Sequence, residues 1–342
     1  MTGPHAALVR TYVPALVGAG ASVLIARSLP FSPFFLVPIG IVALTRGALP
    51  LVLTVFLTVA INLFTVFVSI GSEVARINMV SLISDSAYFL VLVSSFSWAA
   101  YHNDESERRF FSRLSWRFVF AAIGSSLVLF PIILIARRDQ SLVAFFNIQA
   151  AAIADAFKAG AGSDVVQRSL MEKEMTVESI AKTFSLVISR GAVIGHLIFF
   201  GVSWRIAFVI ASFRLPSLRT RHFFMFFRND AFLVWVLIFT LIGVMSTKMI
   251  GNEIFVAVVW NLLLLCVFLY VIQGMAIVAY NLSRPGVPVM LRPLVVFLAA
   301  LIIFRPGINA AAAVALAIVG VAENWLPLRV PINNEPPSTP EA

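Results

Sequence analysis

Long apolar runs recur along the whole chain, and they constrain its fold more than any other feature. About 20 consecutive apolar residues are enough for one helix to cross a bilayer. Of the 342 residues, 60% are hydrophobic and only 12% are charged. A soluble domain is about half apolar and about a quarter charged. The sequence therefore predicts an all-α, polytopic transmembrane helical bundle and excludes an ordinary soluble enzyme.

Charged residues separate the apolar runs and indicate where each predicted span begins and ends. The candidate spans are residues 12–26, 29–44, 48–70, 77–100, 118–136, 184–204, 231–249, 254–279, 289–304 and 308–321. The first two and the last two are short or interrupted by proline. We therefore expect about eight to ten spans, with end residues that are less certain than the spans themselves.

The order of the spans predicts four regions. Residues 1–136 form an N-terminal transmembrane bundle, 137–183 an amphipathic helical connector, 184–330 a C-terminal transmembrane bundle and 331–342 a disordered tail. Apolar residues recur at helical spacing on both sides of Gly160 and Gly162, as in helices that lie in a membrane interface. The connector could cap a cavity, dock a partner, or lie on the lipid surface as a simple link.

Basic residues are distributed unevenly between the two sides of the predicted bundle. One side receives Arg10, Arg46, Arg108, Arg109, Arg113, Arg117, Arg214, Arg219, Arg221, Arg228, Arg284, Arg292 and Arg329. The short loops of the other side receive Arg27, Arg76, Lys248 and Arg305. Because cytoplasmic loops are rich in Lys and Arg, we expect a multi-pass protein of the cell (inner or plasma) membrane with both termini in the cytoplasm. The net charge of +9 then needs no nucleic-acid partner.

Polar and interrupted segments inside the spans predict a ligand site. Pro33 and Pro38 interrupt residues 29–44, which form either a broken or re-entrant helix beside a cavity or a kinked helix packed by its neighbours. Asp85 lies inside a span, where we expect it either to bind a cation, relay a proton or hold a cationic ligand, or to pair with an arginine of a neighbouring helix. We expect His196 to contact a ligand, to act as a gate that responds to protonation, or to bond to a neighbouring hydroxyl or backbone group. These four residues are the candidate ligand-binding set.

Small residues at four-residue spacing predict close contacts with a partner helix. Ala15 and Ala19 have this spacing in the first span, and Gly191 and Gly195 have it in the sixth. Trp204, next to Arg205, is expected to anchor the end of the sixth span at the membrane interface.

Motifs of the common enzyme classes are missing from the sequence. There is no H-E-x-x-H zinc motif, no nucleotide-binding P-loop and no G-x-S-x-G nucleophile elbow. The four histidines are spread over unrelated segments. We expect no enzymatic activity, no catalytic residue, no metal and no cofactor, and any ATP-driven step would need a separate subunit.

Two stretches near the end of the chain carry recognisable patterns. The first has the order N-L … Y-x-x-Q-G-x-A and contains Asn261, Tyr270, Gln273 and Gly274. The second contains Gly320, Glu323, Trp325 and Arg329. It is similar to a G-x-x-D-x-W-x-D-F-R ending, with Glu323 in place of Asp and Pro327-Leu328 in place of Asp-Phe. Together they resemble the YybS-like family of polytopic bacterial membrane proteins, which has no assigned function.

That family is distantly similar to the substrate-binding subunits of energy-coupling-factor transporters and to a cell-shape membrane protein of the MreD type. The first likeness implies a membrane subunit that binds a small molecule and meets a separate ATPase through Ala15 and Ala19. The second implies a scaffold that acts through other envelope proteins. We therefore expect a transporter-like binding subunit that depends on a partner for energy, with an envelope or cell-shape scaffold as the alternative.

Overall fold

A computed structural model of the chain describes residues 4–28, 31–70, 79–101, 107–136, 151, 176–215, 223–284, 287–288, 290 and 308–329. Every regular element within these ranges is a helix, and four of these helices are long and apolar enough to cross a membrane. The predicted all-α transmembrane fold class is thus confirmed. Most of the predicted connector, the predicted span 289–304 and the tail 331–342 lie outside the described residues.

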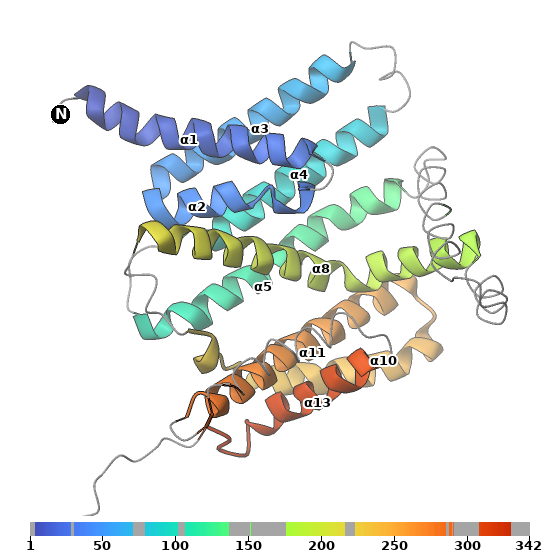
Figure 1. The fold of residues 1–342 in the computed structure, drawn as a ribbon. Helices are drawn as coiled ribbons and strands as arrows, with labels where there is room; N and C mark the ends of the chain where they lie inside the picture. Colours follow the sequence, from blue (N-terminus) through green and yellow to red (C-terminus); the bar gives the residue numbers. More distant parts are fainter. Residues whose placement is uncertain are drawn as a thin grey trace, which may run out of the picture. The chain divides into compact units, whose positions relative to one another are not determined.

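Each of the longer helices in Figure 1 overlaps one predicted span, although α1, α5 and α8 extend beyond theirs. Their bounds are α1 Pro4–Arg27, η1 Ser32–Phe34, α2 Val37–Arg46, α3 Ala48–Ile70, α4 Met79–Ala100, α5 Glu107–Ala136, α8 Val177–Arg214, η3 Phe223–Phe226, α10 Phe232–Ile250, α11 Glu253–Leu282 and α13 Ile308–Ala322. Contacts divide the chain into two compact units: residues 1–221 with 253–261, and residues 222–252 with 262–342. Helix α11 therefore contributes its first turns to the first unit and the rest to the second.

The short helix α2 lies at the centre of the first unit. It contacts α1, α3, α4 and α8, and Figure 1 shows it among these longer helices. A methyl group at Gly40 of α2 would lie 2.7 Å from the Cβ of Ala207 on α8. Glycine at this position lets the two helices approach more closely than any other residue would. The core of this unit is therefore built around a helix that is too short to cross a bilayer alone.

The chain before α2 is broken, as one of the two sequence interpretations expected. The 3-10 turn η1 contains Pro33, and α2 begins afterwards with Pro38 in its first turn. Proline fits the first turn of a helix because the N–H that it lacks has no partner there. The break leaves the carbonyl of Phe35 without a helical partner, and the buried hydroxyl of Ser22 on α1 donates to it over 2.7 Å.

Helix α8 extends farther than the sequence predicted. It continues past Trp204 to Arg214, and it also runs without interruption through residues 183 and 184. The interpretation of Trp204 as an interface anchor is wrong, because its side chain is only 7% exposed. Its ring packs against Phe118 and Phe208 inside the first unit. The residues after Arg205 are mostly apolar and continue the helix, so the single charge of Arg205 does not end it.

Two glycines bring α11 and α13 into backbone contact within the second unit. A side-chain carbon at Gly274 of α11 would overlap the carbonyl oxygen of Leu316 on α13. A side-chain carbon at Gly320 of α13 would overlap the carbonyl oxygen of Tyr270 on α11. The two helices can pack this closely only because both positions lack a side chain.

Candidate functional site

A shallow hollow lies at the helix break of the first unit. Its volume is about 330 Å³, at the lower end of the range of about 300–1,000 Å³ that is usual for small-molecule pockets. The side chains that line it include Ser32, Pro33, Phe35, Tyr88, Phe89 and Phe199. Pro33 of the predicted ligand-binding set is thus on its surface, whereas Pro38 lies in α2 and is not among the described lining residues.

Four of the eight described lining residues of this hollow are aromatic. The rings of Phe35 and Phe89 stack with their centres 4.8 Å apart, and Phe199 lies 5.7 Å from Phe35 at a tilt. The lining residues that the structure describes include no charged side chain. Such a surface favours an apolar or aromatic ligand over an ion.

His196 lies beside the hollow and bonds to hydroxyl groups of two neighbouring helices. Its Nδ1 is 2.9 Å from the Oγ of Ser126 and 3.4 Å from the Oγ of Ser125, both on α5. Its Nε2 is 3.4 Å from the hydroxyl of Tyr88 on α4. The imidazole is buried and stacks on Phe200. His196 therefore reaches the hollow through Tyr88 and is not itself among its lining residues.

Asp85 is exposed on α4 and does not line the hollow. It lies six residues after Met79, so it is about 9 Å along the helix from its first residue. The positive charge of Arg27, at the end of α1, acts on this carboxylate. Arg27 itself donates to Asn62 Oδ1 and to Thr65 Oγ1 on α3, each over 3.1 Å. The structure thus places Asp85 within reach of the charge of Arg27 and outside the described lining of the hollow, three residues before Tyr88, which lines it.

The small residues of the first span are covered by helices of the same chain. Ala15 and Ala19 have no exposed surface. A methyl group at Gly18, between them, would lie 2.9 Å from Val42 on α2 and 3.2 Å from Thr54 on α3. Helices α2 and α3 therefore occupy this face of α1 and leave no surface at the two alanines for a partner helix.

The predicted glycine pair of the sixth span makes no close helix contact among the described residues. A methyl group at Gly195 would meet no described atom within 4 Å. The nearest atom at Gly191 is 3.7 Å away and belongs to Ile194 of the same helix. The polar contact at this level of α8 comes from a different residue, Asn261.

Asn261 of α11 joins α8 by inserting its amide into the backbone hydrogen bonds of that helix. Its Oδ1 accepts from the N–H of Val193 over 3.0 Å, and its Nδ2 donates to the carbonyl of Ser189 over 2.7 Å. An unbroken α-helix would join this N–H and this carbonyl to each other. Side chains that enter a helix in this way commonly bend it. Asn261 therefore has an interhelical structural role.

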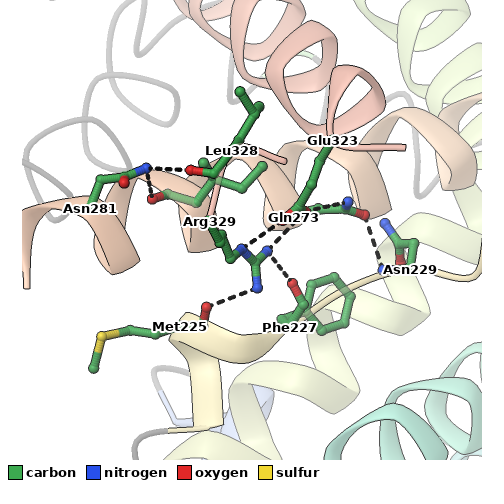
Figure 2. Close-up of polar contacts among 9 residues, drawn as sticks. Met225, Phe227, Asn229, Gln273, Asn281, Glu323, Leu328 and Arg329 are labelled. Carbon is green, nitrogen blue, oxygen red and sulfur yellow. Dashed lines mark hydrogen bonds and ion pairs between the residues drawn. The ribbon is translucent and has the colours of Figure 1, made fainter. Parts of the chain in front are cut away.

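A buried polar cluster closes one end of the second unit (Figure 2). We call it the C-terminal clamp, and it consists of Asn229, Gln273, Glu323 and Arg329. Gln273 of α11 donates to Glu323 Oε2 over 2.7 Å and accepts from the backbone N–H of Asn229 over 3.0 Å. Arg329 Nε lies 2.9 Å from Glu323 Oε1, so these two residues form an ion pair.

Arg329 also fixes the loop that precedes α10. Its guanidinium donates to the carbonyl of Met225 over 2.9 Å and to that of Phe227 over 2.7 Å, as Figure 2 shows. Burial lowers the pKa of the Arg329 guanidinium from its ordinary value, and the charge of Glu323 opposes this shift. The clamp therefore ties α11, the end of α13 and the loop at Phe227 together through one buried cation.

Most of the motif residues have structural roles. Asn261 joins α11 to α8, and others lie at the C-terminal clamp or at the contact between α11 and α13. Tyr270, Gly274 and Gly320 form the contact between α11 and α13, next to the C-terminal clamp. Trp325 lies apart from these contacts, with 69% of its surface exposed. Both carboxylate oxygens of Glu323 and both ends of the Gln273 amide are bonded, so the clamp offers little to a ligand.

Comparisons with known proteins give no relative for this chain: no family model, curated protein or solved structure matches it. Among the described residues, no group of three or more His, Cys, Asp or Glu side chains is arranged to hold a metal ion. The arguments about function therefore depend on the geometry of the chain itself.

The sequence analysis did not identify several residues of the candidate site. Tyr88 follows Asp85 by three residues, which places the two on neighbouring parts of one helix face. Ser125 and Ser126 form an adjacent pair of hydroxyl groups inside an apolar span. Polar residues in predicted spans were a usable signal, but only the structure shows that Tyr88 and the serine pair meet at His196.

Proposed function

We propose that this chain is an integral membrane protein whose first unit binds a small, largely apolar molecule in the hollow at the break before α2. The observation that carries this proposal is the position of the hollow at an interrupted helix. Irregular backbone at membrane depth is tolerated where it is buried in protein or lines a cavity. In many transporters, interrupted helices of this kind form the substrate site.

The length of α2 supports a position of the break well inside a bilayer. Its ten residues span about 15 Å, which is half the thickness of a typical hydrocarbon core of about 30 Å. Arg46 ends α2 and is expected at the membrane surface. The start of α2, and with it the hollow, then lies near the middle of the membrane, where an apolar ligand can enter from lipid.

A transporter-like role in which energy comes from a partner agrees with the sequence, which contains no nucleotide-binding motif. The partner would meet a surface other than Ala15 and Ala19, since these alanines are covered. The likeness to the YybS-like family and to energy-coupling-factor subunits stays a prediction, and so does location in the cell membrane.

Filling the hollow should abolish ligand binding. Ala26 lines the hollow, so Ala26→Phe places a ring inside it. With butylbenzene as the probe at 100 times its Kd, the wild-type chain in lipid nanodiscs should gain about 2.7 kcal/mol of stability, and Ala26→Phe should gain almost none. Ala60→Phe, on an exposed face of α3, is the matched control and should keep the full gain. The proposal fails if both variants respond equally, or if the wild-type chain shows no saturable gain.

An envelope scaffold is the second candidate, and one observation favours it. The hollow is shallow and open to the surface, whereas most ligand pockets enclose the greater part of their ligand. Co-purification from native membranes in nanodiscs separates the two roles. An ATPase pair bound to the chain supports transport, whereas cell-wall or division proteins without saturable probe binding support the scaffold.

A further inference from the structure

The hydroxyl of Tyr88 is the polar group that the hollow shares with the interior of the first unit. Tyr88 lines the hollow and is 43% exposed, and its hydroxyl contacts the buried His196. What this hydroxyl can offer to a ligand depends on whether it donates its proton to His196 or accepts one from it.

The contacts of the serine pair on α5 favour one position for the proton of His196, its Nδ1 atom. Ser125 donates its hydroxyl proton to the carbonyl of Ala122 over 3.0 Å, so its oxygen can only accept from His196 Nδ1. Ser126 Oγ lies 2.9 Å from the same nitrogen. A neutral imidazole has one donor and one acceptor nitrogen, and a proton on Nδ1 suits both serine oxygens. The Nε2 atom is then the acceptor.

With the proton on Nδ1, Tyr88 donates its own proton to His196 Nε2 and keeps its oxygen lone pairs as acceptors. A ligand that complements this oxygen must bring a hydrogen-bond donor. An ammonium group is a poorer choice, because the described lining has no anionic side chain, and the carboxylate of Asp85, three residues before Tyr88, is acted on by the charge of Arg27. A hydroxyl group has the required donor without a charge.

The walls of the hollow define the remainder of the ligand. Phe35, Phe89 and Phe199 present ring faces and edges, which pack well against a flat ring. We therefore propose that the hollow selects a small, flat, uncharged molecule whose hydroxyl group donates a hydrogen bond to the oxygen of Tyr88. This inference rests on the proposed function, since it requires that the hollow binds a ligand at all.

Three probes of similar size test the inference on the wild-type chain in nanodiscs. The hydroxyl of 4-butylphenol can donate, the ether oxygen of 4-butylanisole can only accept, and butylbenzene can do neither. A single net hydrogen bond corresponds to about a fivefold change in affinity. We expect the phenol to bind about fivefold more tightly than the anisole and the hydrocarbon, which should have similar Kd values.

A matched pair of variants assigns the effect to Tyr88. Tyr88→Phe keeps the ring but removes the acceptor, so the phenol should lose its advantage while butylbenzene keeps its affinity. Tyr12→Phe, on an exposed face of α1, should leave all three affinities unchanged. The wild-type comparison needs no variant, so it decides the question even if Tyr88→Phe folds poorly.

The possible outcomes distinguish failure of the inference from failure of the proposed function. Equal binding of all three probes, or tighter binding of the anisole, overturns the hydroxyl inference and leaves the hollow as a ligand site. Loss of the phenol's advantage in Tyr12→Phe as well as in Tyr88→Phe also overturns it. Absence of saturable binding for every probe overturns the proposed function together with the inference.

Discussion

At the scale of single residues, the strongest constraint is the buried ion pair of Glu323 and Arg329. Both side chains are largely buried, and Arg329 is bonded to Glu323 and to two backbone carbonyls. A buried charge that loses its partner is much more costly than the net contribution of the intact pair. The clamp should therefore respond sharply to removal of one partner.

Replacing Glu323 with alanine should lower the free energy of unfolding by about 3 kcal/mol, because it leaves Arg329 buried without a counter-charge. Unfolding of the full chain in detergent, followed by circular dichroism during a denaturant titration, measures this. Glu323→Asp keeps the charge and should lose less. Glu253→Ala removes an exposed carboxylate at the start of α11 and should cost less than about 1 kcal/mol. Equal losses for Glu323→Ala and Glu253→Ala would show that the clamp does not stabilise the fold.

Some contacts of the C-terminal clamp could be predicted from the sequence. Glu323 and Arg329 are six residues apart just after a span, so their pairing was accessible from the sequence. The bonds from Gln273 to Asn229 and Glu323 connect residues 44 and 50 positions apart. Such contacts depend on how the helices pack, which the hydrophobic pattern of each helix does not specify.

At the scale of the elements, the contact between α11 and α13 depends on the two glycines Gly274 and Gly320. Each lies directly against a backbone carbonyl of the opposite helix. In a bilayer, helices associate through van der Waals packing and close backbone approach rather than through the hydrophobic effect. A side chain at either glycine must push the helices apart.

Gly274→Ala and Gly320→Ala should each lower the free energy of unfolding by about 3 kcal/mol, since neither carbonyl can move away without displacing its helix. Gly201→Ala is the control, because its added methyl group meets no described atom within 4 Å. Glycine is a poorer helix former than alanine, so Gly201→Ala should be neutral or slightly stabilising. The same denaturant titration in detergent measures all three. A neutral Gly274→Ala would contradict the close contact of the two helices.

Helix positions were more predictable than helix interruptions and lengths. Helix α3 begins and ends at the predicted residues 48 and 70, since an apolar run bounded by polar residues defines a span. The break before α2 could be inferred from its prolines, but not the hydroxyl of Ser22 that stabilises it. Helix α8 exceeded its prediction because Trp204, which resembles an interface residue in sequence, is a core residue here.

At the scale of the whole molecule, the two units have different characters. The first contains the interrupted helix, the aromatic hollow and the cluster of Tyr88, His196 and Ser126. The second contains the tight α11–α13 contact and the C-terminal clamp, whose polar groups bond to one another. The proposed ligand site thus belongs to the first unit, whereas Gln273, Gly274, Gly320, Glu323 and Arg329 of the second unit make contacts within its fold.

The candidate site was predicted only in outline. Pro33 and His196 were both identified from sequence, and the structure places them at or beside one hollow. Asp85 was expected there too, because a carboxylate within a span usually faces a cavity. The sequence could not show that Asp85, in the first half of α4, lies on an exposed face and within reach of the charge of Arg27.

Photolabelling in lipid nanodiscs tests the central claim most directly. A diazirine derivative of butylbenzene would be activated on the wild-type chain, and mass spectrometry would locate the labelled peptides. We predict saturable labelling in peptides that contain residues 26–35, 88–92 and 199, removed by excess butylbenzene and by Ala26→Phe. Labelling spread over the lipid-facing helices, without saturation and unchanged in Ala26→Phe, would contradict a ligand site at the helix break.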